Sequence, residues 1–258
     1  MATSAHWSRC EIGGCCVIEA GMDRPRPIYF MKSKLAQGLK MRLRRNLYRA
    51  SGLVLTRSMQ YLERERQPYT YGDYVRESSL ELVAQEIHAA NIPGSVCELG
   101  VYRGDFSARI NAAFKDRRLY LFDTFEGFSE KDKDIEIDNN FSFAAQDFSD
   151  TCIDTVIKKM KYPENIVIRK GHFPTTLLDS DAAEIFAFVS LDADLYHPIY
   201  EGLRFFYPRL SRGGYIFVHD YNNIHYAGVK AAVKRYCGDN GLGYFPLTDP
   251  CGSVIISK

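Results

Sequence analysis

From Asn91 onward, short apolar runs alternate with stretches whose apolar residues recur at helical spacing. The apolar runs predict strands over residues 95–99, 119–122, 166–169, 185–191 and 214–218. The helical stretches between and after them cover residues 105–114, 151–161, 198–210 and 227–236. This alternation predicts a doubly wound α/β domain, in which a mostly parallel sheet carries helices on both faces. Two last runs, 243–247 and 253–257, predict a C-terminal antiparallel hairpin.

Two segments do not fit this alternation. Residues 71–90 place apolar residues at helical spacing ahead of the first strand, which predicts a covering helix with Asp73 or Ser78 as its N-cap. Residues 129–150 are polar and charged without apolar periodicity. They predict a mobile loop that orders over a ligand cleft, because they lie directly after the second strand and its turn.

The N-terminal part of the chain has its own pattern. Residues 1–30 mix glycine, cysteine, proline and arginine without periodicity, which predicts a disordered tail. In residues 31–68, lysines and arginines precede the first acid, Glu63, and leucines recur at helical spacing. This predicts a basic amphipathic helical extension before a domain over residues 69–258. Either its leucine face docks on the domain or on a second subunit in a homodimer, or it makes weak contact with an anionic membrane surface.

Composition and charge exclude several classes of protein. The 258 residues are 46% hydrophobic and 25% charged, as in a globular domain, and a net charge of +1 gives no field that attracts nucleic acid. No apolar run approaches the roughly 20 residues of a membrane-spanning helix. The seven cysteines form no Cys-x-x-Cys pair, which argues against a zinc knuckle or disulfide framework and favours the reducing cytoplasm.

The first predicted strand ends in a glycine turn that suits a bound nucleoside. Glu98 stands near the end of the strand, and Gly100 and Gly104 frame the turn before a helical pattern begins. Glycine lets the backbone approach a ligand closely, and the following helix offers free N–H groups at its N-terminus. The spacing Glu-x-Gly-x-x-x-Gly differs from the dinucleotide fingerprint. We therefore interpret the turn as the first loop of a nucleoside-binding domain, with Glu98 facing the ligand.

The second predicted strand ends in an acid, Asp123. An acid at this point, roughly 20 residues after the glycine turn, suits bidentate hydrogen bonding to the hydroxyls of a ribose. The alternative is that Asp123 only caps the turn that follows it.

The fourth and fifth predicted strands also end in acids. Asp192 and Asp194 follow the fourth strand, and His219 and Asp220 follow the fifth. Neighbouring strand ends bring Asp192 and Asp220 within reach of one cation, and carboxylates suit magnesium or manganese better than zinc. Such an ion can lower the pKa of a substrate hydroxyl and orient it, while a neighbouring carboxylate takes the proton. The alternative is that both acids cap turns.

Motifs in these same places resemble one enzyme family, the macrocin O-methyltransferases. They are Cys-Glu-Leu-Gly-Val-Tyr-Arg-Gly at 97–104, Phe-Asp-Thr-Phe-Glu-Gly-Phe at 122–128, Leu-Asp-Ala-Asp-Leu-Tyr at 191–196 and Gly-Gly-Tyr-Ile-Phe-Val-His-Asp-Tyr at 213–221. The resemblance covers residues 71–258. It implies a Rossmann-like methyltransferase that uses S-adenosylmethionine and magnesium or manganese. The acceptor it implies is a hydroxyl of a small molecule, a sugar or glycosylated compound.

The resemblance also implies roles for single residues. Glu98 and Gly100 would lie near the methionine part of the cofactor and Asp123 on the ribose. Asp192 would be a metal ligand and the base. The family's Asp-Asp-Tyr reads His219-Asp220-Tyr221 here, so the predicted metal ligands are Asp192, His219 and Asp220, with Asp192 and His219 as the catalytic pair. The predicted cofactor-binding residues, which include the turn near the adenine, are Glu98, Gly100, Tyr102, Gly104, Asp123, Thr124, Phe125, Gly171 and His172.

Three other functions share parts of this pattern. A metal-dependent glycosyltransferase also has Asp-x-Asp after an apolar strand, but it does not explain the glycine turn or Asp123. A phosphatase would carry its Asp-x-Asp on the first strand rather than the fourth. A non-catalytic nucleotide-binding module is the remaining alternative.

Overall fold

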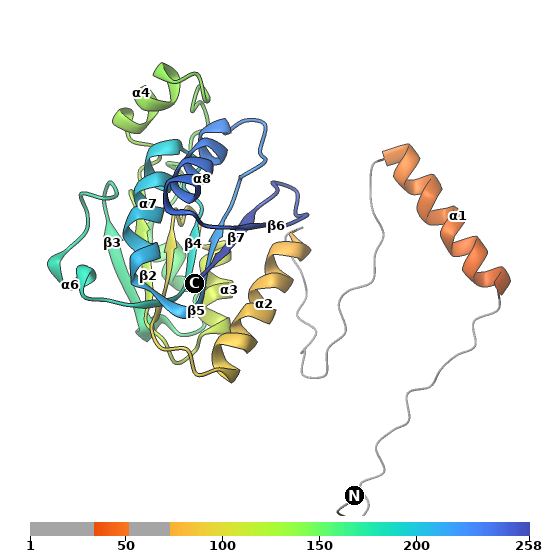
Figure 1. Ribbon diagram of the computed structural model, residues 1–258, viewed down its shortest axis with the longest axis horizontal. Coiled ribbons are helices and arrows are strands. Elements are labelled where there is room, and N and C mark those ends of the chain that lie inside the picture. The colour runs from red at the N-terminus through yellow and green to blue at the C-terminus, as the bar shows by residue number, and fades with distance from the viewer. Residues whose placement is uncertain (1–33, 52–72) are drawn as a thin grey trace, which may run out of the picture. The chain divides into compact units, whose positions relative to one another are not determined.

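The computed structural model describes residues 34–51 and 73–258 of the chain, which belong to two compact units (Figure 1). In the first unit, helix α1 spans Lys34–Ser51, within the segment for which the sequence predicts a basic helix. Leu39 and Leu43 of α1 are exposed. The predicted tail over residues 1–30 lies outside the described residues. None of the helices in the described ranges is both long enough and apolar enough to cross a bilayer.

The second unit is built on a seven-stranded sheet with the order β3-β2-β1-β4-β5-β7-β6. Strands β3 to β5 in that order run parallel, and β7 and β6 add to the edge in antiparallel pairing. The predicted doubly wound fold with a C-terminal antiparallel hairpin is therefore confirmed. The strands are β1 (Ser95–Leu99), β2 (Leu119–Asp123), β3 (Ile166–Lys170), β4 (Phe186–Leu191), β5 (Leu210–Val218), β6 (Phe245–Pro246) and β7 (Val254–Ser257).

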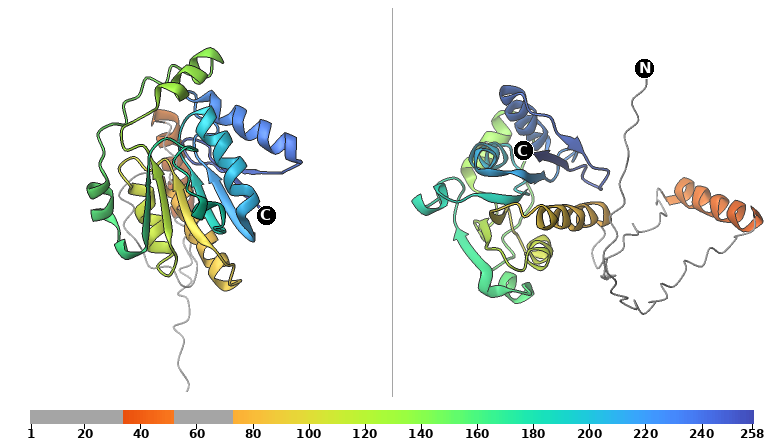
Figure 2. Two further views of the ribbon diagram at one scale, coloured as in Figure 1. Left: turned by 90° about the vertical axis from the view of Figure 1, so that its left-hand side faces the viewer. Right: turned by 60° about the horizontal axis from the view of Figure 1, so that its bottom comes forward.

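Helices cover both faces of this sheet (Figure 2). Helices α7 and α8 pack on each other over one face, and α2 and α3 pack on each other over the opposite face. Helix α2 begins after Asp73, whose carboxylate accepts a hydrogen bond from the backbone N–H of Arg76, so Asp73 is the cap. The helices are α2 (Tyr74–Ala89), α3 (Asp105–Ala113), α4 (Glu130–Asp138), α5 (Ile153–Lys159), α6 (Asp179–Ala182), α7 (Tyr196–Arg209) and α8 (Ala227–Asn240), with a 3-10 turn over Pro163–Asn165.

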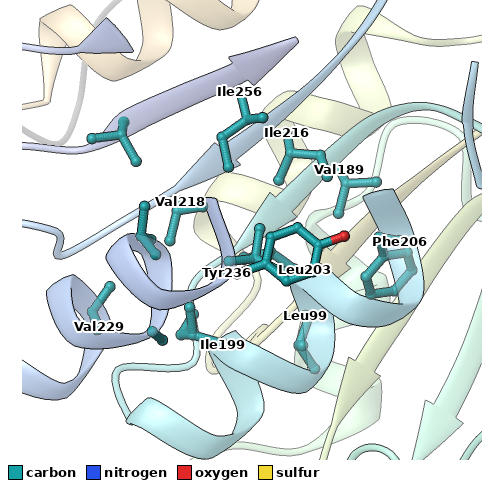
Figure 3. Packing of buried hydrophobic residues seen from close by; sticks show 14 of the residues in the cluster. Leu99, Val189, Ile199, Leu203, Phe206, Ile216, Val218, Val229, Tyr236 and Ile256 are labelled. Atoms are coloured by element: carbon teal, nitrogen blue, oxygen red, sulfur yellow. The ribbon is translucent and has the colours of Figure 1, made fainter. Parts of the chain in front are cut away.

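The apolar side chains form one buried cluster on each face of the sheet. Strands that are buried on both faces have continuous apolar sequences, which is why the apolar runs predict where the strands lie. Burying a Leu, Ile or Phe side chain contributes roughly 1.5–3 kcal/mol, so these clusters make the sheet a firm platform for its loops. Figure 3 shows the cluster under α7 and α8, with labelled members Leu99, Val189, Ile199, Leu203, Phe206, Ile216, Val218, Val229, Tyr236 and Ile256.

One sequence prediction is wrong: residues 130–138 are not a loop but helix α4. Its N-cap is Ser129, whose hydroxyl accepts a hydrogen bond from the backbone N–H of Asp132. Helix α4 buries the carboxyl side chains of Asp132 and Glu136 toward the domain. A helix that buries acids leaves no apolar periodicity in the sequence. Residues 139–150 contain neither helix nor strand, as predicted.

The parallel strands end at one level. The backbone N–H of Gly100 donates to the carbonyl of Phe122 at 2.9 Å, that of Asp192 to Leu99 at 2.8 Å, and that of His219 to Leu191 at 2.9 Å. The loops that follow these strands therefore leave the sheet along one edge. The strand order reverses between β1 and β4, and ligands of open α/β sheets bind beyond such a point.

Gly100 allows two of these loops to touch. Its φ is +85°, and a Cβ at this residue would lie 2.1 Å from the carbonyl oxygen of Asp192. We expect Gly100→Ala to lower the free energy of unfolding by about 3 kcal/mol or more, because the substitution adds both backbone strain and a backbone clash. Chemical denaturation measures this change.

Gly238→Ala is the matched control. Gly238 lies inside α8, and a Cβ there meets no atom within 4 Å. It should raise the free energy of unfolding by about 0.5–1 kcal/mol, as alanine does in a helix. Similar small effects of the two substitutions would contradict the close approach at Gly100.

Candidate active site

A cavity of about 430 Å³ opens beyond the carboxyl ends of β1, β2, β4 and β5. Two of the predicted residues do not line it. Gly104 is the N-cap of α3, and Phe125 is buried in the core. The predicted residues that do line the cavity are Glu98, Gly100, Tyr102, Asp123, Thr124, Gly171, His172, Asp192, His219 and Asp220.

Asp123 connects the loops after β1 and β2. Its Oδ2 accepts hydrogen bonds from the backbone N–H groups of Val101 at 2.6 Å and Tyr102 at 2.9 Å. Its Oδ1 accepts one from Phe125 at 2.6 Å, so the predicted turn-capping role of Asp123 is present. A carboxylate offers about four lone-pair positions, and three are used here. The geometry leaves room for one further donor, and the ribose contact of Asp123 stays a prediction.

Glu98 is a buried acid at the end of β1, with 1% of its surface exposed. The hydroxyl of Ser107 donates to its Oε2, and the Nη2 of Arg76 lies 3.9 Å from its Oε1. Burial raises the pKa of Glu98 to about 8, although Arg76 acts in the opposite direction. Glu98 therefore holds its proton in the domain at pH values where an exposed glutamate has lost it.

Arg76, which is not among the predicted site residues, reaches the site from the first turn of α2. Its Nη1 donates to the Oδ2 of Asp192 at 2.9 Å, and its Nη2 donates to the hydroxyl of Ser190 at 3.1 Å. Its guanidinium lies 3.7 Å from the centre of the Phe106 ring, and only 6% of the residue is exposed. Arg76 thus places a fixed positive charge under the acids at the end of β4.

The ends of β4 and β5 bring Asp192, His219 and Asp220 together. The Nδ1 of His219 lies 2.9 Å from the Oδ1 of Asp192 and 2.6 Å from the Oδ2 of Asp220. Burial raises the pKa of Asp192, but Arg76 and His219 outweigh it and hold that pKa below its usual range. Burial lowers the pKa of His219, but the two carboxylates raise it to about 12. His219 is therefore a second positive charge among these acids.

Asp194 belongs to the same cluster, although it was not in the predicted site. It lines the cavity, and one carboxylate oxygen each from Asp192, Asp194 and Asp220 lies within 4.8 Å of the others. Burial and the two neighbouring acids raise the pKa of Asp194 well above its ordinary value. Asp194 and Asp220 have φ values of +59° and +57°. Such strained backbone at non-glycine residues clusters at functional sites.

Residues 128–150, here called the roof segment, form part of the cavity wall. Phe148 packs edge-to-face against Tyr102, with ring centres 5.0 Å apart, and against Phe128 at 5.1 Å. The hydroxyl of Tyr102 donates to the Oδ1 of Asp150 at 2.6 Å. An aromatic contact and a charge-assisted hydrogen bond thus connect the C-terminal end of the roof segment to the loop after β1, and Phe128 at the other end packs on Phe148.

Fold and site together define an S-adenosylmethionine-dependent O-methyltransferase. The chain belongs to the Macrocin-O-methyltransferase (TylF) family, whose model matches residues 45–249. The resemblance found in the four motifs is therefore confirmed, and S-adenosylmethionine is the cofactor of the family. This membership decides against the glycosyltransferase, phosphatase and non-catalytic alternatives.

Individual proteins show how far the similarity extends. The chain is 25% identical over 191 residues to the 8-demethyl-8-(2,3-dimethoxy-alpha-L-rhamnosyl)-tetracenomycin-C 4'-O-methyltransferase of Streptomyces olivaceus, covering 69% of each chain. It is 27% identical over 181 residues to the mycinamicin III 3''-O-methyltransferase of Micromonospora griseorubida, covering 65% of this chain and 69% of that one. The crystal structure of CalS11, a calicheamicin methyltransferase, has the same fold, with a TM-score of 0.57, 17% identity and coverage of 93% and 98%.

The raised pKa of Glu98 predicts a pH-dependent stability. A group whose pKa is higher in the folded state stabilises the fold fully at low pH, and this contribution is lost as the pH rises through the folded-state pKa. Between pH 5 and pH 8, the wild type should lose on the order of 4 kcal/mol of unfolding free energy relative to Glu98→Gln. Urea unfolding of both proteins across this range gives the difference.

Glu164→Gln is the control for this measurement, because Glu164 is exposed in the 3-10 turn before β3. Its difference from the wild type should stay nearly constant with pH. A Glu98→Gln difference that also stays constant would show that Glu98 is ionised in the folded domain.

Proposed function

We propose that this enzyme methylates a hydroxyl of a sugar or glycosylated small molecule with the help of a divalent cation. The observation that carries the proposal is the cluster of Asp192, Asp194 and Asp220 at the wall of the cofactor cavity. One relative is named for a rhamnosyl tetracenomycin, which supports a sugar acceptor. S-adenosylmethionine supplies the methyl group as an electrophile on sulfur, and the acceptor supplies the oxygen.

The residues of the cavity fit the cofactor at its charged and polar ends. Glu98 offers a buried carboxyl group, which would ionise against the ammonium of the methionine part, and Asp123 offers its remaining lone pair to a ribose hydroxyl. Gly171 and His172, in the turn after β3, stand where the adenine is expected. The roof segment excludes water from this side of the cavity, since Phe128 and Phe148 line it.

The acidic cluster fits magnesium or manganese. Its donors are carboxylate oxygens, which these hard cations prefer. Asp192, Asp194 and Asp220 carry three negative charges when ionised, and the neighbouring Arg76 and His219 carry two positive ones. The remaining negative charge would favour a bound cation, and that cation would lower the pKa of a hydroxyl that it binds. The role of His219 as a metal ligand stays a prediction. Its Nδ1 lies within hydrogen-bonding distance of both Asp192 and Asp220, so that nitrogen is already occupied.

We assign the proton transfer to Asp194 rather than to Asp192. Both oxygens of Asp192 already accept hydrogen bonds, one from Arg76 and one from His219. The Nδ1 of His219 faces Asp192 and Asp220 and carries a proton, so His219 is also poorly suited to accept the proton of the substrate hydroxyl. Asp194 lies in the cavity beside Asp220 and, in its ionised form, can take the proton of the acceptor hydroxyl.

Asp123→Ala tests the cofactor assignment. We expect it to weaken S-adenosylhomocysteine binding by about 1.5–3 kcal/mol, the usual loss for hydrogen bonds to a charged group. Calorimetric titration measures the affinity, and thermal unfolding without ligand checks that the loops remain folded. Glu126→Ala, an exposed acid in the same loop, is the control and should bind normally. An unchanged affinity in Asp123→Ala would remove Asp123 from the cofactor site.

Asp194→Asn tests the chemistry. With a glycoside acceptor found by screening, kcat should fall by about 100-fold or more, while S-adenosylhomocysteine affinity stays within a factor of a few. EDTA should abolish wild-type turnover and magnesium should restore it. Binding of manganese followed by electron paramagnetic resonance should weaken in Asp220→Asn. Turnover that is insensitive to EDTA would contradict the metal, and normal turnover in Asp194→Asn would contradict the base.

A further inference from the structure

A second group of metal-type ligands lies on the other side of the cavity. Asp132 of α4, His172 in the turn after β3 and His197 in the first turn of α7 each point one donor atom at the others, all within 4.8 Å. The Oδ2 of Asp132 is 2.9 Å from the Nε2 of His172, and its Oδ1 is 2.7 Å from the Nδ1 of His197. The family resemblance assigns no metal to these residues.

The two imidazole rings are held in matching orientation. The rings of His172 and His197 are nearly parallel, with an angle of 9° between their planes and 5.9 Å between their centres. Asp132 lies between their nitrogens with 7% of its side chain exposed, and each histidine side chain is 21% exposed. Three separate segments of the chain therefore converge on one small, mostly buried point.

We propose that Asp132, His172 and His197 form a zinc site. This site would connect helix α4, and with it the rest of the roof segment, to the body of the domain. Two imidazoles and one carboxylate are a typical set of three protein ligands for zinc. Zinc bonds of about 2.0–2.2 Å place tetrahedral ligand atoms about 3.3 Å apart, so the present distances need to open by only about half an ångström. The mixed nitrogen and oxygen donors separate this site from the all-carboxylate cluster at Asp192.

The surroundings of the three ligands also suit a metal. The hydroxyl of Ser129 donates to the Oδ2 of Asp132 at 2.8 Å, and Thr175 places its hydroxyl 3.5 Å from the Nδ1 of His172. Such outer contacts orient the ligands of zinc sites. Asp132 and His172 line the cofactor cavity, so the fourth position of the ion faces that space. To bind zinc, each ring nitrogen that faces Asp132 has to present a lone pair, with the proton of the neutral ring on its other nitrogen.

The consequence concerns the roof segment. Ligands in α4, in the turn after β3 and in α7 connect it to two separate parts of the sheet edge. Zinc would therefore stabilise the closed arrangement of the cavity without taking part in methyl transfer. This proposal is independent of the magnesium proposed at Asp192, Asp194 and Asp220.

Cobalt titration of the full-length, metal-free protein tests the site, because cobalt reports zinc sites by its visible absorption. We expect one equivalent to bind with the strong visible absorption of tetrahedral cobalt, which cobalt on the all-carboxylate cluster lacks, and zinc to displace it. His197→Ala and His172→Ala should each weaken binding by more than the roughly 10–100-fold that loss of an outer contact costs. His225→Ala, an exposed histidine before α8, and Asp220→Asn should bind as the wild type does. Zinc should raise the melting temperature of the wild type but not of the two ligand variants.

Several outcomes would overturn the proposal. The first is the absence of zinc and cobalt binding in the wild type, with Asp132 then serving only as a hydrogen-bonded anchor of α4. The second is strong tetrahedral cobalt absorption that persists in both histidine variants, or an intense thiolate-to-cobalt band, because the first places the ion on other ligands and the second places it on cysteines. Melting temperatures without metal, with His197→Gln as a milder variant, separate loss of the site from loss of the fold.

Discussion

The buried ion pair between Arg76 and Asp192 is the interaction on which the site depends. Asp192 belongs to a group of acids at the end of β4 and β5, and removing such charges from water is costly unless a cation is held against them. Arg76 provides that cation from α2, and its guanidinium is fixed between Phe106 and Ser190. Removing one partner of such a pair typically costs about 3–5 kcal/mol. The pair therefore joins the covering helix to the catalytic edge of the sheet.

The fold could be predicted from the sequence because its strands are short, apolar and separated by clear helices. The positions of Asp123, Asp192 and Asp220 could be predicted for the same reason, since the ends of parallel strands meet at one edge. Helix α4 could not, because Asp132 and Glu136 are its buried residues and acids give no apolar period.

The side chains that enter the site from segments distant in the sequence could not be predicted either. Arg76 and Asp192 are separated by 116 residues, and nothing around Arg76 indicates which acid it meets. Asp132 and His197 are brought together only when α4 packs against α7. Asp194 stood in a visible Asp-x-Asp motif, but the hydrogen bonds that occupy both oxygens of Asp192, and so favour its neighbour, appear only in three dimensions.

At Gly100 the loops after β1 and β4 touch and form one continuous wall of the cavity. The turn after β1 and the backbone of Asp192 touch there without an intervening side chain. A displacement of either loop is therefore transmitted to the other, and the two halves of the cavity cannot be reshaped separately at this point. Over residues 139–150 the roof segment has neither strand nor helix, and side-chain contacts such as that of Asp150 with Tyr102 hold it to the loop after β1. Changes to those side chains can reshape that part of the cavity wall, whereas at Gly100 the backbone itself fixes the distance between the two loops.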